Sequence, residues 1–313
     1  MRSLTPLLAA LALAFAGPAL AGPLAYVPNE KSASVSIIDT ATDRRQGEIV
    51  VGQRPRGSAS DGGAHLYLTD AKAGSLLIVD TASGKLLRSV RLGDSPEGIS
   101  LSADGKLLAV AVEDDNSVVL LTAPEGREVA RIKVRGRNPE HAVFSPDGRW
   151  LYVSAEEAEQ LDVIDVAARR QVASIAVGKR PRGIAFLPDG SRAYVACEMA
   201  GKVYAIDVAA QRVVAEIQAG QYPNGLAVHP DGKRVFVSNG RDPSVMAIDT
   251  ASNTVVASVE VGKRPWNMAL TPDGAKLYVA NGRSNSVSVI DTASFKKLSD
   301  IEVGELPWGV SIR

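Results

Sequence analysis

A short turn that ends in proline recurs along this chain at a nearly constant spacing. The turn prolines are Pro55, Pro96, Pro139, Pro181, Pro223, Pro265 and Pro307. The intervals between them are 41, 43, 42, 42, 42 and 42 residues. A period in this range is typical of a four-stranded β-propeller blade rather than of a helical solenoid. The spacing therefore predicts a protein built from seven repeated units.

Residues 261–292, VGKRPWNMALTPDGAKLYVANGRSNSVSVIDT, represent one unit well. After the turn come an alternating strand, a Pro-Asp-Gly hairpin, a second strand, a polar turn and a third strand. Asp-Gly pairs favour tight hairpins because glycine accepts a positive φ. Apolar residues occupy both parities of the strands, as expected where both faces of a sheet are covered. We expect antiparallel blades that pack against both of their neighbours.

The two ends of the chain complement each other. Residues 24–27 align with the second strand of a unit, so the first unit lacks its first strand. Residues 307–313 supply a turn and one first strand, and there the sequence stops. Pairing these ends closes the ring and removes an exposed inner edge. The prediction is an all-β, seven-bladed β-propeller closed by a shared blade, with one C-terminal and three N-terminal strands.

The N-terminus has the features of a signal peptide. Arg2 is followed by a short apolar run at 7–16, and the residues 19–21 form a small-x-small cleavage site. The apolar run is too short to span a bilayer comfortably. We expect residues 1–21 to be removed after Ala21, and residues 22–313 to form one domain in the periplasm or outside the cell, without a membrane anchor.

Composition excludes several classes of function. The 35 basic residues balance the 35 acidic ones, so no electrostatic footprint for nucleic acid exists. The single cysteine, Cys197, cannot form an internal disulfide and is expected to be a small buried thiol. No Cys-x-x-Cys-His, no paired metal-binding cysteines and no Gly-x-Ser-x-Gly are present. The sequence therefore predicts no cofactor and no metal.

The repeat resembles a known family. The segments LYVAN at 277–281 and VIDTA at 289–293, with the Val-Gly-x-x-Pro-x-Gly turn and the Pro-Asp-Gly hairpin, are similar to the YVTN-type seven-bladed β-propeller repeat. The resemblance covers residues 24–313 and is greatest to exported propellers associated with PQQ-dependent (quinoprotein) alcohol catabolism. It implies an accessory role beside a periplasmic quinoprotein dehydrogenase or cytochrome, without implying that this chain binds the quinone.

The residue after each turn proline is the position that the repeat does not fix. These seven residues are Arg56, Glu97, Glu140, Arg182, Asn224, Trp266 and Trp308. Turns before the first strand and turns between the second and third strands emerge on the same face of a blade. We therefore expect the seven residues to ring the mouth of the central channel, where loops on a rigid scaffold commonly carry a site. Neutral variation of surface loops is the alternative.

His141 occupies a turn position that is glycine in five other units. At the channel mouth a histidine is suited to act as an acid, a base or a ligand. A hydrogen-bonded structural histidine is the alternative. His65 and His229 lie beside Asp-Gly hairpins on the opposite face and are expected to be structural.

Glutamates follow the second strand in three successive units, as Glu113, Glu156 and Glu198. Such a cluster is suited to bind a cation such as calcium or a basic patch of a partner. It lacks the ligand spacing of a known calcium loop, which favours a solvated acidic face.

Large aromatic residues occupy three successive turns, as Tyr222, Trp266 and Trp308. At the mouth they are suited to stack on a flat ligand or to anchor a protein partner. Packing on each other to plug the channel is the alternative.

Three functions follow from these observations. The first is a non-catalytic exported propeller that binds a protein partner or a small ligand at its turn-rich mouth. The second is a lactonase-like hydrolase, since related propellers include such enzymes, with Glu97, Glu140, His141 and Arg182 as its acid–base and oxyanion groups. The third is a tetrapyrrole-binding or electron-transfer propeller in which His141 is the axial ligand.

Overall fold

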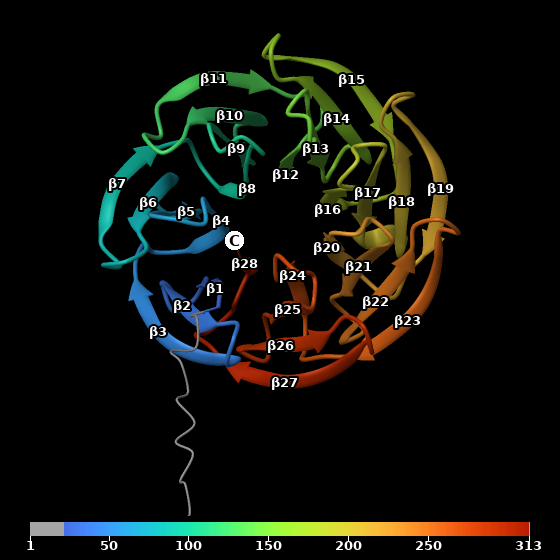
Figure 1. The fold of residues 1–313 in the computed structure, drawn as a ribbon. Helices are drawn as coiled ribbons and strands as arrows, with labels where there is room; N and C mark the ends of the chain where they lie inside the picture. The colour runs from blue at the N-terminus through green and yellow to red at the C-terminus, as the bar shows by residue number, and fades with distance from the viewer. Residues whose placement is uncertain (1–21, 313) are drawn as a thin grey trace, which may run out of the picture.

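The computed structural model describes residues 22–312. These residues form seven four-stranded antiparallel sheets arranged as a ring around a central axis (Figure 1). The predicted signal peptide, residues 1–21, lies outside the described residues. The seven-bladed propeller predicted from the repeat is thereby confirmed.

The first strand of each blade lies nearest the axis and the fourth forms the rim (Figure 1). Blade 1 consists of β4 (Pro55–Ser60), β5 (His65–Asp70), β6 (Ser75–Asp80) and β7 (Leu86–Arg91). Blade 2 consists of β8 (Pro96–Leu101), β9 (Leu107–Val112), β10 (Ser117–Thr122) and β11 (Glu128–Lys133). Blade 3 consists of β12 (Pro139–Phe144), β13 (Trp150–Ala155), β14 (Gln160–Asp165) and β15 (Arg170–Ala176).

Blade 4 consists of β16 (Pro181–Phe186), β17 (Arg192–Cys197), β18 (Lys202–Asp207) and β19 (Arg212–Gln218), with the 3-10 turn η1 (Glu198–Ala200) after β17. Blade 5 consists of β20 (Pro223–Val228), β21 (Arg234–Asn239), β22 (Ser244–Asp249) and β23 (Thr254–Glu260). Blade 6 consists of β24 (Pro265–Leu270), β25 (Lys276–Asn281), β26 (Ser286–Asp291) and β27 (Lys296–Glu302). Within residues 22–312, no helix is long and apolar enough to cross a membrane.

Blade 7 joins the two ends of the chain. It consists of β28 (Ser311–Ile312), β1 (Leu24–Asn29), β2 (Ser34–Asp39) and β3 (Arg44–Val50). Ala25 pairs with Ile312 and Tyr26 with Ser311, and the Trp308 amide donates to the Pro28 carbonyl at 2.9 Å. The predicted closure by one C-terminal and three N-terminal strands is confirmed. Because this blade contains both ends of the chain, the pairing of β28 with β1 closes the ring.

The hydrophobic core lies between the blades. Seven clusters of buried residues are present, and each contains side chains from two neighbouring blades. Tyr152 and Leu161 of blade 3, for example, pack with Ile184 and Val195 of blade 4. Burial of both sheet faces explains why apolar residues occur on both parities of the strands. The core thus holds the blades at fixed angles and fixes where their loops meet.

The hairpins between first and second strands are built by the repeated Asp-Gly pairs. The glycines at these turns have φ values of 70° to 75°, which favour glycine over other residues. The aspartate accepts a backbone N–H two residues later, as Asp147 does from Arg149 at 3.1 Å. These bonds satisfy the turn locally, so this end of the ring is fixed by the repeat itself.

Candidate functional site

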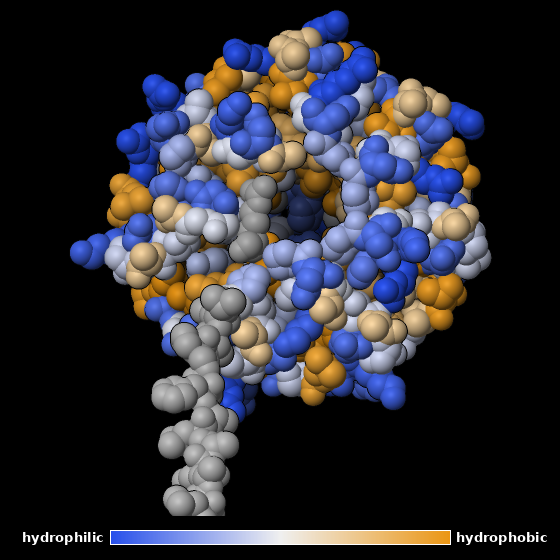
Figure 2. All heavy atoms as spheres, in the orientation of Figure 1, coloured by the Kyte–Doolittle hydropathy of each residue, from blue (hydrophilic) through white to orange (hydrophobic). Residues whose placement is uncertain are grey.

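The turns before the first strands meet at one end of the central channel, and the loops after the second strands reach the same end. Together they enclose a cavity of about 360 Å³. Its lining includes all seven residues that follow the turn prolines: Arg56, Glu97, Glu140, Arg182, Asn224, Trp266 and Trp308. Figure 2, seen from the opposite, hairpin end, shows that the ring is hollowed at its centre.

The shape of the turns positions these side chains. The residue before the proline has a positive φ, between 54° and 59°, at six of the seven turns. These residues are Ser95, Asn138, Arg180, Tyr222, Arg264 and Leu306. Non-glycine residues adopt this conformation only where the surroundings determine it. The fixed backbone of these turns therefore positions the side chains of Arg180 and Arg264 at the mouth.

Arg182 is the centre of a buried ionic network. Its Nη1 lies 2.7 Å from Glu140 Oε1, its Nη2 lies 2.6 Å from Glu156 Oε1, and its Nε lies 3.0 Å from Glu198 Oε2. Arg180 reaches the same two loop glutamates, at 2.8 Å from Glu156 Oε1 and 3.3 Å from Glu198 Oε2. Burial strengthens such charge-assisted bonds, so the network ties blades 3 and 4 together at the mouth.

A second network lies beside it. Arg56 forms an ion pair with Glu97 and a longer contact of 3.4 Å with Glu30 Oε1, which Arg54 Nε contacts at 2.5 Å. Glu97 is only 1% exposed, and its Oε2 has no hydrogen-bond partner among residues 22–312. We call the side from blades 1 to 4, with Arg56, Glu97, Glu140 and Arg182, the charged arc.

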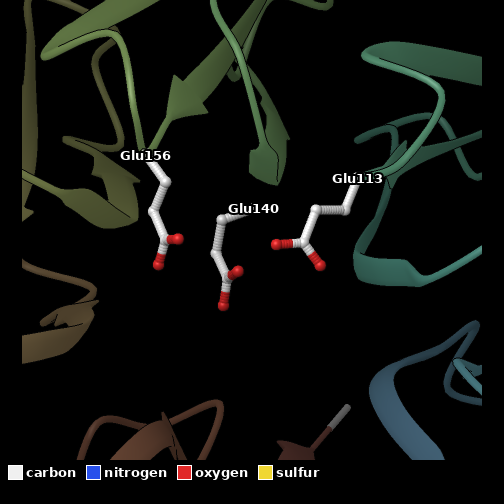
Figure 3. A group of neighbouring side chains, drawn as sticks. All are labelled: Glu113, Glu140 and Glu156. Atoms are coloured by element: carbon white, nitrogen blue, oxygen red, sulfur yellow. The ribbon is translucent and has the colours of Figure 1, made fainter.

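Three glutamates of the mouth approach one another closely. Carboxylate oxygens of Glu113, Glu140 and Glu156 lie within 4.8 Å of one another and point into the same space (Figure 3). Such oxygen atoms are suited to a hard cation, but Arg182 already compensates two of the three charges. The expectation of a solvated acidic face is wrong for Glu156 and Glu198, which are buried because the arginines fold over them, but Asp114 and Glu157 are exposed.

Two carboxyls in this cluster have pKa values shifted in opposite directions. Burial works to raise the pKa of Glu140, but the charges of Arg182 and of its neighbours outweigh it and hold that pKa below its usual value. Burial also raises the pKa of Glu156, and there it prevails over the attraction of Arg182. Repulsion from Glu140 adds to the rise. A pair of carboxyls separated in this way is a common arrangement of acid–base sites.

The other side of the mouth is lined mainly by aromatic and amide side chains, with Arg264 beside them. We call it the aromatic arc; it contains Asn224, Trp266 and Trp308, from blades 5 to 7. The Arg264 guanidinium lies 5.5 Å from the centroid of the Trp266 ring. The Trp308 ring tilts against the His141 ring, with centroids 5.6 Å apart. The two tryptophans therefore rest on different partners and leave the cavity open.

His141 lies one layer deeper than the mouth residues. It lines a smaller chamber of about 150 Å³, together with Trp308, Asn267 and glycines such as Gly98. A Cβ on Gly98 would come within 2.6 Å of His141 Nδ1, which explains the glycine there. Among the described residues, its Nε2 has no hydrogen-bond partner. Burial lowers the pKa of His141, so the neutral imidazole is favoured.

The remaining candidates lie elsewhere. Tyr222 does not line the mouth cavity, contrary to the expectation of a three-aromatic cluster; it lines a separate groove over blades 5 and 6. His65 and His229 pair with hairpin aspartates at 2.7 Å each, which confirms their structural interpretation. Cys197 is fully buried, and burial raises the pKa of its thiol to about 12. The prediction of a small buried thiol is confirmed.

Sequence reasoning missed Glu30 and Arg54, which both line the mouth. A signal for each was present. Glu30 follows a second strand, in the repeat position of Glu113, and Arg54 precedes a turn proline, in the repeat position of Arg264. Two further repeat positions therefore contribute to the mouth in several units, beside the residue after the proline.

Solved structures similar to this chain share the ring. A chain of Kuenenia stuttgartiensis hydrazine synthase has 26% identity and a TM-score of 0.78, covering 86% of this chain and 92% of its own. A functionally unknown protein from Desulfotomaculum acetoxidans has 17% identity and a TM-score of 0.81, covering 92% and 98%. The dihydro-heme d1 dehydrogenase NirN in complex with DHE has 17% identity and a TM-score of 0.68, covering 92% and 74%.

At these identities the last two structures support the fold alone. No curated protein matches the chain. The profile of one protein family does match, over residues 13–172 and 167–302, and its description is "Lactonase, 7-bladed beta-propeller". The match covers most of the sequence and every blade, in agreement with the ring described above. The chain belongs to this lactonase family of seven-bladed β-propellers.

Proposed function

We propose that the channel mouth binds a small polar ring compound, such as a lactone. The observation that carries this proposal is the division of one cavity into a charged arc and an aromatic arc. Carboxylates accept directional hydrogen bonds from hydroxyl groups, and guanidinium groups donate them to carbonyl and hydroxyl oxygens. Tryptophan faces stack on flat or C–H-rich rings. A cavity of about 360 Å³ lies at the lower end of the range of roughly 300–1,000 Å³ for small-molecule sites.

Intrinsic fluorescence tests this proposal directly, because two of the three tryptophans line the mouth. Titration of the mature protein with sugar lactones and hydroxy acids should change the emission in a saturable way. Trp266→Phe and Trp308→Phe should each reduce that change. Trp150→Phe is the matched control, since Trp150 begins β13 away from the mouth. Absence of any saturable change, or equal loss in the control, would contradict binding at this site.

A second candidate is hydrolysis of the bound lactone. It is favoured by membership of the family and by the opposite pKa shifts of Glu140 and Glu156. Glu156 accepts a proton from the water that attacks the carbonyl carbon, and Arg182 stabilises the oxyanion that forms on the carbonyl oxygen. Collapse breaks the ring C–O bond, and the leaving oxygen takes the proton from Glu156. His141 lies in the inner chamber, so it is less suited to this role.

Turnover of lactones separates the two candidates. If the protein is a hydrolase, Glu156→Gln should abolish ring opening while ligand-induced fluorescence remains. His141→Ala should leave turnover largely intact. Loss of turnover in His141→Ala at an unchanged melting temperature would transfer the acid–base role to that residue. A protein that binds but never opens lactones is a binding propeller only.

Export remains a prediction from the N-terminal residues 1–21. The accessory role in quinoprotein metabolism and the dehydrogenase or cytochrome partner remain predictions that rest on the resemblance alone. A tetrapyrrole ligated by His141 is supported least, because its chamber of about 150 Å³ is below the roughly 300–1,000 Å³ of ordinary ligand sites. Incubation with haem and an absorbance spectrum would test it.

A further inference from the structure

A second hollow lies on the mouth face, over blades 5 and 6. We call it the basic groove; it has a volume of about 440 Å³ and is lined by Tyr222, Gly240, Arg241, Pro243, Lys263, Arg264 and Arg283. Among the residues that the structure describes, no carboxylate lines it. Four cationic side chains are thus held around one depression.

The charges of the basic groove are largely uncompensated, unlike those of the charged arc. Within residues 22–312, no ion pair is formed by Arg241, Lys263 or Arg283, and Arg264 has only a distant contact of 3.8 Å with Glu198. Burial lowers the pKa of Arg264, and repulsion from Arg283 contributes. Arg241 instead lies over the Tyr222 ring at 5.3 Å and donates to its hydroxyl at 3.3 Å. Such a concentration of like charge attracts an anionic partner.

We propose that the basic groove docks an acidic segment of a partner protein. Arg241, Lys263 and Arg283 are exposed, and one exposed ion pair contributes only about 0–1 kcal/mol. A small anion that meets solvated groups of this kind binds weakly. A peptide with several carboxylates engages all of them and shields them from water. Arginine and tyrosine are also the residues that most often dominate protein interfaces.

The opposite side of the mouth face argues against extended anionic partners. Glu113, Asp114 and Asp115 follow β9 in blade 2, and Glu157 lies in the equivalent loop of blade 3. A flat anionic membrane or a long nucleic acid laid across this face would meet those carboxylates, which repel it. A short acidic segment fits the basic groove without reaching them. The proposal is independent of the ligand of the mouth cavity.

The probe is a short fluorescein-labelled peptide of alternating glutamate and glycine, followed by fluorescence anisotropy. It should bind with an affinity that falls as salt is added, because screening weakens exposed charges. Arg241→Gln, Lys263→Gln and Arg283→Gln combined should weaken binding about tenfold or more, which corresponds to at least about 1.4 kcal/mol. Arg264 is left unchanged, so that the mouth is not disturbed.

The matched control removes the same amount of positive charge away from the basic groove, where the fourth strands of three blades begin. Its substitutions are Arg44→Gln, Lys85→Gln and Lys296→Gln. All three side chains are exposed. If the control weakened peptide binding equally, the effect would be explained by net charge alone, and the proposal would be overturned. The proposal is also overturned if the acidic peptide does not bind, or if a glutamine–glycine peptide binds with the same affinity. Displacement of the probe by inorganic phosphate at equal charge concentration would overturn it too, as would binding of anionic vesicles through the same residues.

Discussion

The two ends of the propeller are built differently, although every blade contributes a loop to both. At the hairpin end each Asp-Gly turn satisfies its own backbone, as Asp273 does by accepting the Ala275 amide at 2.9 Å. At the mouth end, side chains from different blades satisfy one another, as Arg182 does with Glu140, Glu156 and Glu198. Local turns tolerate change one at a time, whereas a shared network does not. The contrast indicates that the mouth is the specialised end.

The strongest test of this comparison removes the centre of the network. Arg182→Met leaves three buried carboxylates without their main cation, and removal of one partner from a buried ion pair costs about 3–5 kcal/mol. We expect urea unfolding at neutral pH to show a loss of this size. Adding Glu156→Gln should restore part of it, because one uncompensated charge disappears.

The matched change at the hairpin end is Arg149→Met. Arg149 is exposed and lies 4.5 Å from the Trp150 ring, a contact that contributes about 0.5–1 kcal/mol at exposed sites. If both variants lost the same stability, the two ends of the ring would not differ in the way described.

Not every residue near the mouth is specialised, and Asn281 sharpens that distinction. Its fully buried amide donates to Ser286 Oγ at 3.1 Å and to Ser288 Oγ at 2.9 Å, as the repeat requires. Asn281→Ala leaves buried hydroxyls without a donor, and we expect a loss of about 1–3 kcal/mol. Thermal unfolding measures the loss. Ligand-induced fluorescence should be preserved; its disappearance would show that the repeat residues also shape the site.

The sequence predicts the architecture almost completely. The repeat period, the hairpins and the complementary ends each follow from short sequence patterns. The positions of Pro265 and Gly274 within their blade can therefore be predicted without knowing any other blade. The same logic identified the seven residues after the prolines, since their position in the repeat fixes their height in the ring. Prediction succeeds wherever a residue's place depends on its own unit.

The interactions of the site were not predictable in this way. Arg182 contacts glutamates from two neighbouring blades, and the pairing depends on side-chain reach across an interface rather than on spacing. Tyr222 shares its repeat position with Arg264, yet it lines only the basic groove, whereas Arg264 lines both hollows. Glu156 is buried because arginines cover it, and the residues near Glu156 in the sequence do not indicate that burial.

The hairpin end should respond weakly to single changes. Asp273 accepts Thr271 Oγ1 at 2.6 Å and the Ala275 amide, and the Thr271 bond holds the pKa of its carboxyl below the usual value. Asp273→Ala should cost about 0.5–1.5 kcal/mol by urea unfolding, the net value of a typical hydrogen bond. Since the folded pKa is lowered, this stabilisation is present above the unfolded pKa and is lost as pH falls through the folded one. A loss as large as that of Arg182→Met would remove the contrast between the ends.

His141 gives the smallest effect at neutral pH, and one that grows with acidity. Burial lowers its pKa from an ordinary value of 6.5, so below that pH the unfolded chain binds a proton that the folded chain does not. Stability therefore rises with pH through this window and falls as the solution is acidified. His141→Asn, which places there the residue found at Asn267, should reduce the slope of unfolding free energy against pH. An unchanged slope would mean that the imidazole is protonated inside the ring, where only solvent or a ligand in the inner chamber can meet its free Nε2.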